Sequence, residues 1–319
     1  MSAPPRLLIV LVGPTASGKS ALGAALAEKF GGEVLVCDST QVYRHFDIGT
    51  AKVPAQGRAR VPHHLMDLRE PTEEFTAGDF LREARATLAE VSACGRVAIV
   101  TAGTGLYLRA FLEGFSPLPA RSPELRARFE ERAAERGSEY LHRVLARVDA
   151  ASAREIAPRD TPKLIRALEV CFLVRRPRSE LFREGRDRLE GYTVVKLGLL
   201  PDRKKLYERI EARVEGMLAA GWLEETRRLR ERFGDRVKPV GFLGYKQLAA
   251  HLRGELSFKE AVKQIKHETR QYAKRQITWF RKEPGVGWLH GFGDEPAIKE
   301  EAAGRLQVRL ERVGPRTSS

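Results

Sequence analysis

The chain of 319 residues has few cysteines and no long apolar run. Cys37, Cys94 and Cys171 are far apart, form no Cys-x-x-Cys pair and have no histidine close by, which excludes a zinc ribbon and a disulfide framework. No run is long enough to cross a bilayer, and the apolar stretch at residues 7–12 is too short for the core of a signal peptide. We therefore expect a cytoplasmic protein without a membrane segment.

Acidic residues are fewer than basic residues, and the difference lies entirely outside residues 1–118. The formal net charge is +14, from 56 Lys and Arg against 42 Asp and Glu. Residues 1–118 hold 12 of each sign, whereas residues 191–319 hold 27 basic and 17 acidic residues. A basic region beside a neutral one is typical of a protein that binds a polyanion such as nucleic acid. An arginine-rich surface without any partner explains the charge equally well.

A phosphate-binding loop is the strongest motif. The apolar run at residues 7–12 predicts a strand buried on both faces, and the spacing of residues 21–30 predicts a helix that ends at Gly31. Between them the chain fits the pattern Gly-x-x-x-x-Gly-Lys-Ser/Thr, with Gly13, Pro14, Thr15, Ala16, Ser17, Gly18, Lys19 and Ser20. The N–H groups of such a loop bind phosphate oxygens, the lysine neutralises them, and the hydroxyl can ligate Mg²⁺. The sequence thus predicts a phosphate or diphosphate site.

A carboxylate follows the second predicted strand, at residues 33–37. This strand delivers Asp38 to the edge of the sheet at which ligands bind in open α/β folds. Asp38 can cap a helix or act as a general base, and its place beside the phosphate loop favours the base.

The strand predicted at residues 96–101 runs into Ala102, Gly103 and Thr104 and brings no Asp for Mg²⁺, which argues against ATP hydrolysis. Two alternatives stay open. One is a small-molecule or nucleoside kinase that holds ATP in the same loop, and the other is a nucleic-acid-binding module switched by a nucleotide.

Seven segments together resemble the bacterial tRNA dimethylallyltransferases. In order they read GPTASGKS, DSTQVY, DIGTAK, GTGLYL, LEGFSPLP, RALEV and AKRQITWFRK. The likeness runs from Gly13 to about Trp288, and departs from the family at Ala102, where Gly is usual, and at Ser20, where Thr is also common. Neither change removes a functional group.

The resemblance implies a fold and an activity. The fold is a P-loop NTPase-like α/β core, a parallel sheet flanked by helices, with a mostly helical insertion domain. The activity is transfer of a dimethylallyl group from dimethylallyl diphosphate to N6 of the adenosine immediately 3′ of the tRNA anticodon, with Mg²⁺. Because that base is stacked in the anticodon loop, it must be extruded into a pocket.

Residue roles follow from the same resemblance. We expect Asp38 to accept the N6 proton, Gln41 to hold the adenine edge, Lys19 and Arg213 to stabilise the diphosphate in the loop, and Ser20 to hold Mg²⁺. Contacts with tRNA are implied for Asp38, Ser39, Thr40, Gln41, Thr104, Arg126, Pro162, Lys163, Leu164, Ile165, Arg166, Gly241, Phe242, Leu243, Gly244, Tyr245, Lys246, Lys274, Arg275, Gln276, Ile277, Thr278, Trp279, Phe280 and Arg281. His63 and His64 follow Pro62 in a predicted loop and receive no role.

Residues 257–282 predict a basic amphipathic helix. A stripe of cations repeats at gaps of three and four, at Lys259, Lys263, Lys266, Arg270 and Lys274. The adjacent apolar face is formed by Phe258, Val262, Ile265, Tyr272, Ile277 and Phe280. For a lone helix a solvated charged face is the ordinary interpretation. The resemblance instead favours backbone phosphates of tRNA along the stripe, with an affinity that falls as salt rises.

Residues 202–233 predict a second long helix. With Leu206 as reference, Ile210, Val214 and Met217 lie within about 80° of it, and Arg213 falls about 20° to the other side, inside the apolar stripe. An arginine that points to the interior needs an anion, either a structural carboxylate or a ligand's diphosphate. The resemblance favours the diphosphate.

The chain is divided at residues 118 and 190. A helix at residues 123–136, a second helix that starts at Thr161 with Pro162 in its first turn, and a strand at residues 193–199 indicate an insertion into the core. We expect residues 1–118 and 191–319 to form the α/β core with the basic C-terminal helices, and residues 119–190 to form a helical insertion domain that contacts tRNA. We expect a monomer.

Overall fold

The computed structural model describes residues 6–116, 118–183 and 185–313, and these fall into two compact units. The first unit consists of Met1–Phe111 and Glu190–Ser319, and the second of Leu112–Leu189. The second unit thus begins a few residues before the start predicted at residue 119.

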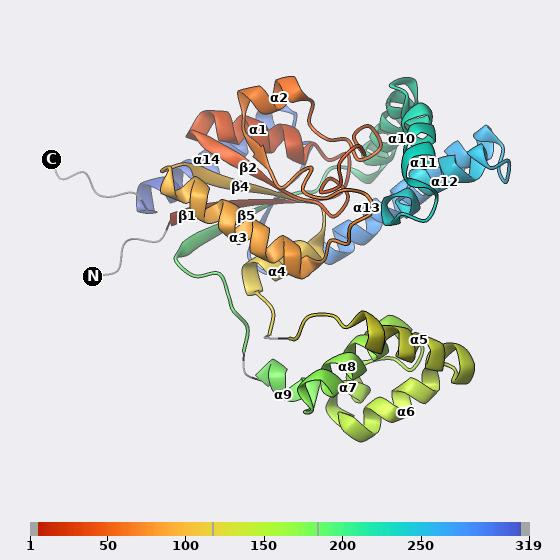
Figure 1. The fold of residues 1–319 in the computed structure, drawn as a ribbon. Helices are drawn as coiled ribbons and strands as arrows, with labels where there is room; N and C mark the ends of the chain where they lie inside the picture. Colours follow the sequence, from red (N-terminus) through yellow and green to blue (C-terminus); the bar gives the residue numbers. More distant parts are fainter. Residues whose placement is uncertain (1–5, 117, 184, 314–319) are drawn as a thin grey trace. The chain divides into compact units, whose positions relative to one another are not determined.

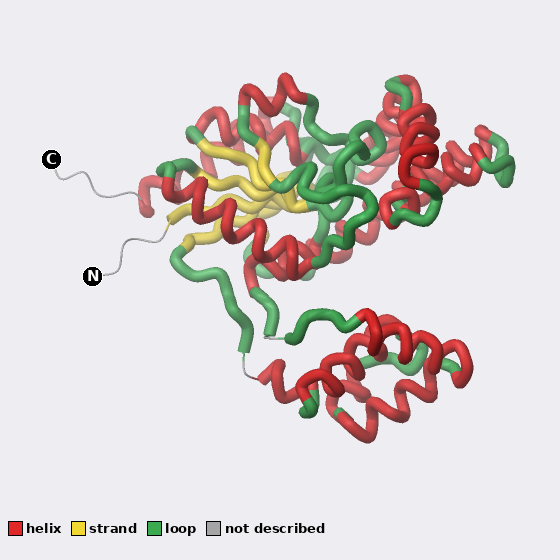
Figure 2. Tube along the Cα trace, viewed as in Figure 1, coloured by secondary structure: helices red, strands yellow, loops and turns green. Residues whose placement is uncertain are grey.

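A six-stranded, all-parallel sheet forms the centre of the first unit (Figures 1 and 2). Its spatial order is β3-β2-β4-β1-β5-β6. The strands are β1 Arg6–Val12, β2 Gly32–Cys37, β3 His63–His64, β4 Val97–Ala102, β5 Tyr192–Leu199 and β6 Val286–Leu289. The four strands predicted from apolar runs are all present. The predicted loop at His63 and His64 is wrong, because both residues pair with β2 as an edge strand, opposite Val34 and Leu35.

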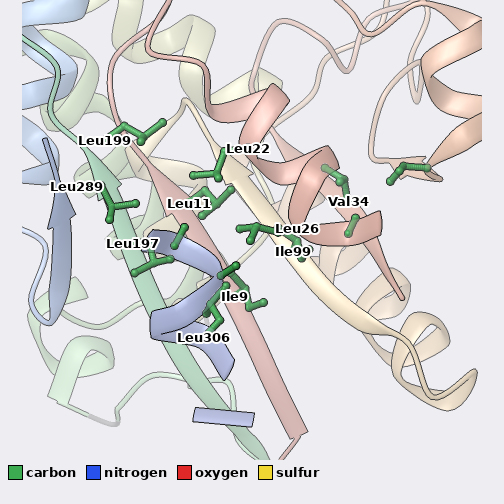
Figure 3. Packing of buried hydrophobic residues seen from close by; sticks show 14 of the residues in the cluster. Ile9, Leu11, Leu22, Leu26, Val34, Ile99, Leu197, Leu199, Leu289 and Leu306 are labelled. Carbon is green, nitrogen blue, oxygen red and sulfur yellow. The ribbon is translucent and has the colours of Figure 1, made fainter. Parts of the chain in front are cut away.

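Both faces of the sheet are covered by helices, as a parallel sheet requires. Helices α1 Lys19–Phe30 and α14 Pro296–Val313 lie on one face, and α3 Ala77–Ala93 lies on the other (Figure 1). Figure 3 shows leucines of α1 and α14 against Ile9 and Leu11 of β1. These side chains are almost completely buried. Burial of apolar surface stabilises the folded state by about 25 cal/mol per Å². This packing of helices on the sheet therefore holds the strands, and the loops at their carboxyl ends, in place.

Further helices extend the first unit beyond the sheet. They are α2 Ala55–Arg60, α4 Gly105–Glu113, which leads into the second unit, α10 Arg203–Ala219, α11 Trp222–Phe233, the 3₁₀ turn η1 Lys238–Gly241, α12 Tyr245–Leu252 and α13 Phe258–Phe280. The single helix predicted at residues 202–233 is wrong. It is broken at Gly221, whose φ of 98° lies in the left-handed region that glycine adopts without strain.

The second unit is helical. It contains α5 Pro123–Arg136, α6 Ser138–Val148, α7 Ala150–Glu155, α8 Thr161–Val174 and α9 Arg178–Arg183. The helix predicted at residues 123–136 is confirmed with the same bounds, capped by the Ser122 hydroxyl, and the helix predicted from Thr161 starts there. Leucines of α6 and α8 form its core.

Among the described residues, none of the helices combines the length and the apolar character needed to cross a lipid bilayer.

Candidate active site

A cavity of about 490 Å³ lies at the carboxyl end of the sheet in the first unit. The phosphate loop after β1 and the segment after β2 form one side, and residues of α10, α11, α12 and α13 form the other. Its lining includes Lys19, Asp38 and Arg213, which the sequence predicts as catalytic. Ligands of open α/β sheets bind at this edge because the loops of neighbouring strands meet there.

The phosphate loop joins β1 to α1 through backbone that side chains rarely permit. Gly18 precedes α1 with φ 87°, and a Cβ there would lie 2.7 Å from the nitrogen of Gly293. The Gly293 N–H donates to the Ser17 carbonyl over 2.9 Å, so the loop before α14 supports the phosphate loop from outside. Inside, the buried Ser17 hydroxyl has no partner among the described residues. The loop therefore holds a fixed shape with a free polar group.

Lys19 is half-buried on the cavity wall and folds back onto its own loop. Its Nζ donates to the carbonyls of Gly13 at 2.8 Å and Pro14 at 2.7 Å. The pKa of this ammonium is lowered to about 7, mainly by burial and further by the charge of Arg213, while the charge of Asp38 acts in the opposite direction. An anion bound beside Lys19 would restore its full charge.

Arg213 lies on α10 and its side chain lines the cavity. It lines the cavity together with the buried residues Ile210 and Val214, but Arg213 itself is exposed, so it points into the cavity and not into the apolar core. Burial lowers the pKa of the guanidinium, and the charge of Asp38 raises it in part. In the part of the chain that the structure describes, no carboxylate forms an ion pair with Arg213. The sequence left two partners open for Arg213, a structural carboxylate and a ligand's diphosphate. The described residues provide no carboxylate in contact with it.

Asp38 is the carboxylate nearest to these cations and divides its two oxygens. Oδ1 accepts from the N–H of Thr40 at 2.8 Å and from its hydroxyl at 2.6 Å, which is a side-chain turn and not a helix cap, because no helix follows Asp38. Oδ2 accepts no hydrogen bond from the described residues and lies close to Gly103, where a Cβ would come within 2.9 Å of it. The turn and a role as base are therefore compatible, because one oxygen fixes the carboxylate and the other is available.

Two further predicted residues lie beside Asp38. The Thr104 hydroxyl oxygen accepts from the N–H of Ser39 at 3.0 Å, and this ties the loop after β4 to the end of β2. Gln41 lines the cavity and donates one amide hydrogen to the carbonyl of Thr50 at 3.2 Å. This leaves its carbonyl oxygen and a second hydrogen for a ligand.

Glu225 is a structural residue that the sequence did not reveal. Its carboxylate accepts from the N–H groups of Asp47, Ile48 and Gly49 at 3.1, 2.8 and 3.3 Å. It also accepts from the Tyr245 hydroxyl at 2.5 Å. Through these bonds α11 and α12 hold the loop opposite Gln41. No local pattern predicts this, because the partners are about 180 positions apart in the chain.

The cationic stripe predicted on α13 is partly engaged within the protein. Lys266 pairs with Glu215, and Arg270 pairs with Glu211, both on α10. Lys259, Lys263 and Lys274 are exposed. The predicted apolar face is correct for Ile265 and Phe280, which are buried, but Phe258 is 41% exposed, so its assignment to that face is wrong. The helix begins at this residue, whose ring lies 5.5 Å from that of His251.

The end of α13 forms a shallow basic groove with α4. Lys274, Arg275, Thr278 and Trp279 line it, and the Arg109 guanidinium lies 4.9 Å from the Trp279 ring centroid. Arg281 is exposed beyond the helix end, whereas Ile277 is half-buried.

The segment before and within α12 faces the cavity. Phe242, Leu243, Tyr245 and Lys246 line it, and Lys246 also pairs with Glu268 at 2.7 Å. Gly241 is exposed, and Gly244 is buried with φ 92°.

In the second unit, the predicted tRNA contacts differ in exposure. Pro162 and Lys163, in the first turn of α8, are exposed, whereas Leu164 and Ile165 are buried in the core. Arg126 and Arg166 both approach Glu169, at 3.7 and 2.7 Å, and the Glu169 side chain is completely buried. This carboxylate, which the sequence did not reveal, therefore fixes two of the predicted arginines.

Known proteins are similar to this chain in sequence. The family model described as IPP transferase matches residues 41–283. The tRNA dimethylallyltransferase of Solibacter usitatus is 52% identical over 300 residues, which cover 94% of this chain and 97% of the relative.

Solved structures are similar too. The tRNA isopentenylpyrophosphate transferase of Bacillus halodurans superposes with a TM-score of 0.72 at 34% identity, covering 96% of this chain and 97% of its own. A eukaryotic dimethylallyltransferase acting on tRNA superposes with a TM-score of 0.82 at 27% identity, covering 96% of this chain and 79% of its own.

The fold is thus a P-loop NTPase-like core, and the chain is an enzyme of the prenyltransferase class. It belongs to the IPP transferase family.

Proposed function

We propose that this chain transfers a dimethylallyl group from dimethylallyl diphosphate to N6 of the adenosine immediately 3′ of the anticodon in tRNA, and releases diphosphate. The relatives named above support the activity. One observation of this structure carries the proposal. A single cavity joins a phosphate loop, a guanidinium without a carboxylate partner and a carboxylate with one available oxygen.

The loop from Gly13 to Ser20, with Lys19 and Arg213, would bind the diphosphate of the donor. N6 attacks C1 of the donor while the C1–O bond breaks, and the electron pair of that bond leaves with the diphosphate. Negative charge therefore grows on the leaving group, where prearranged cations and N–H groups stabilise it most effectively. The positive charges of Lys19 and Arg213 repel each other in the free protein. A diphosphate between them would offset this repulsion, because each cation then has an anionic partner.

Asp38 and Gln41 would bind the adenine that accepts the dimethylallyl group. As N6 forms its new bond it loses a proton, and we assign this proton to the Asp38 carboxylate through Oδ2. Gln41 presents an amide oxygen and an N–H to the adenine edge, the pairing that this side chain makes with adenine. A general base of this kind contributes about 10²- to 10⁴-fold in rate.

Mg²⁺ fits this site together with the diphosphate. Within the described residues no cluster of three or more His, Cys, Asp or Glu side chains could hold a metal ion. The Ser20 hydroxyl lines the cavity, and Mg²⁺ commonly combines one or two protein ligands with substrate phosphates and water. Ser20 would hold the ion, which would neutralise charge on the leaving group.

The RNA is assigned to the exposed predicted residues. In the first unit these are the basic groove at the end of α13 and the cavity edge near Lys246, and in the second unit they include Lys163. Trp279 and the arginine stacked on it offer a surface for a base and a charge for a phosphate. We expect the chain to act as a monomer in the cytoplasm.

Mass spectrometry of tRNA nucleosides tests the proposal. Purified protein is incubated with unmodified tRNA, Mg²⁺ and either dimethylallyl diphosphate or ATP. We expect N6-dimethylallyladenosine with the prenyl donor, and neither that nucleoside nor a phosphorylated product with ATP. Unchanged nucleosides with the prenyl donor would contradict the proposal, and a phosphorylated product with ATP would support the kinase instead.

A further inference from the structure

Gln276 lies in the predicted RNA-binding segment of α13, but its side chain is buried in the wall of the active-site cavity. It is only 6% exposed, whereas Lys274 and Arg275 beside it are exposed. It lies one turn from Tyr272 and one turn from Phe280, which places it on the apolar side of the helix. A buried amide needs partners for both of its ends.

Both ends of this amide bond to backbone, and the two partners belong to different loops of the active site. Oε1 accepts from the N–H of Thr15, in the phosphate loop, at 2.8 Å. Nε2 donates to the carbonyl of Gly103, after β4, at 2.8 Å. One side chain therefore connects the loop after β1 to the loop after β4.

The Gly103 end reaches Asp38. The N–H groups of Gly103 and Thr104 both donate to the carbonyl of Cys37, at 3.0 and 3.1 Å, and Cys37 directly precedes Asp38. Gly103 also lies against the available oxygen of that carboxylate. A shift of Gly103 would therefore move one wall of the space around the proposed base.

Little else in the described structure replaces these bonds. The Tyr272 hydroxyl also approaches the Gly103 carbonyl, but at 3.4 Å, which is a weak contact. Removing the amide would leave a partly buried N–H without its partner and a partly buried C=O with a weak one, and loops relax to avoid such groups. The relaxation would change the separation of the phosphate loop from Asp38.

We propose that Gln276 is a positioning residue that sets the distance between the bound diphosphate and the proton acceptor, and that it makes no contact with tRNA. The inference rests on the proposed function, because it needs a donor in the phosphate loop and an amine beside Asp38. Misplacement of reacting groups by about 1 Å can cost about 100-fold in rate, so the effect belongs to the transfer step.

The test compares Gln276→Leu, which removes both bonds at similar size, with Gln264→Leu, the same change at an exposed position of α13. For each protein, kcat at saturating donor and RNA, KM for dimethylallyl diphosphate, and the Kd of an anticodon stem-loop are measured. Gln276→Leu should lower kcat about 100-fold, and leave the RNA Kd within about threefold of wild type. Gln264→Leu should match wild type in all three.

Two results would overturn the proposal. One is a weaker RNA Kd with kcat unchanged at saturation, which would make Gln276 an RNA contact. The other is an unchanged kcat for Gln276→Leu.

Should that variant fail to fold, Gln276→Glu decides, because it keeps the acceptor for Thr15 and loses the donor to Gly103. Its kcat should fall with the RNA Kd unchanged, and a wild-type kcat would again overturn the proposal. Absence of transfer by the wild-type protein would instead count against the proposed function.

Discussion

Replacing Arg213 by methionine separates ligand binding from stability more sharply than any other change at the site. Methionine keeps an unbranched apolar stem in the helix face and removes the charge and the N–H donors of the guanidinium. Because no carboxylate among the described residues pairs with Arg213, the variant loses no ion pair in the free protein. We therefore expect an unfolding temperature equal to or above that of the wild type.

The loss in function follows from the missing charge. A hydrogen bond to a charged group contributes about 1.5–3 kcal/mol, which corresponds to about 10- to 150-fold in an equilibrium or rate constant. We expect kcat/KM for dimethylallyl diphosphate to fall by that factor, with the Kd for an anticodon stem-loop unchanged. Arg213 is also one cause of the low pKa of Lys19, so that pKa should rise in the variant.

Steady-state kinetics at saturating RNA, RNA-binding anisotropy and calorimetry measure these effects. Arg203→Met is the matched control, since Arg203 begins the same helix and is exposed. It should leave kcat/KM unchanged. A variant Arg213→Met with wild-type kcat/KM would refute the placement of the diphosphate. A large drop in unfolding temperature would refute the conclusion that Arg213 has no structural partner.

Three other predictions follow from the same geometry. Asp38→Asn keeps the oxygen that accepts from Thr40 but loses the base, so single-turnover transfer should fall about 10²- to 10⁴-fold with RNA affinity intact, and near-normal transfer would show that the proton goes elsewhere. Lys19 has a pKa of about 7 when free, so donor binding at higher pH should take up a proton and weaken as pH rises. Calorimetry in two buffers detects this uptake, which must vanish in Lys19→Met. Gly49→Ala would place a Cβ 2.0 Å from Nε1 of the buried Trp222 and should lower the free energy of unfolding by about 1–3 kcal/mol. Gly216→Ala, in open space on α10, should raise it by about 0.5–1 kcal/mol. Equal unfolding temperatures for the two variants would contradict the packing around Gly49.

Local patterns predicted much of the fold. The apolar runs before Gly13 and Asp38 are typical of strands buried on both faces, and each strand ends at a loop that lines the cavity. The same patterns failed where a single residue or a distant partner decides. Gly221 breaks a helix that the apolar spacing continues, and His63 and His64 become a strand only because β2 offers them a pairing edge.

In the candidate site too, local features were predictable and contacts between distant residues were not. Helical spacing was sufficient to place Arg213 on the side of α10 that lines the cavity, because direction on a helix is a local property, although the residue stays exposed to solvent. Gln276 lies on the apolar side of α13 by the same spacing, so a signal for its burial was present in the sequence. Its partners were not predictable, since Thr15 is 261 positions away and Gly103 is 173 positions away. Glu225 and Glu169 likewise depend on distant backbone and side chains.

The central claim is that the phosphate loop and Arg213 receive the diphosphate while Asp38 faces the amine. A crystal structure with a non-reactive dimethylallyl diphosphate analogue tests it directly. We predict both phosphorus atoms within the loop from Gly13 to Ser20, with Lys19 turned from the carbonyls of Gly13 and Pro14 toward them, and C1 of the analogue facing Asp38. Phosphorus atoms bound elsewhere, away from Lys19 and Arg213, would contradict the account.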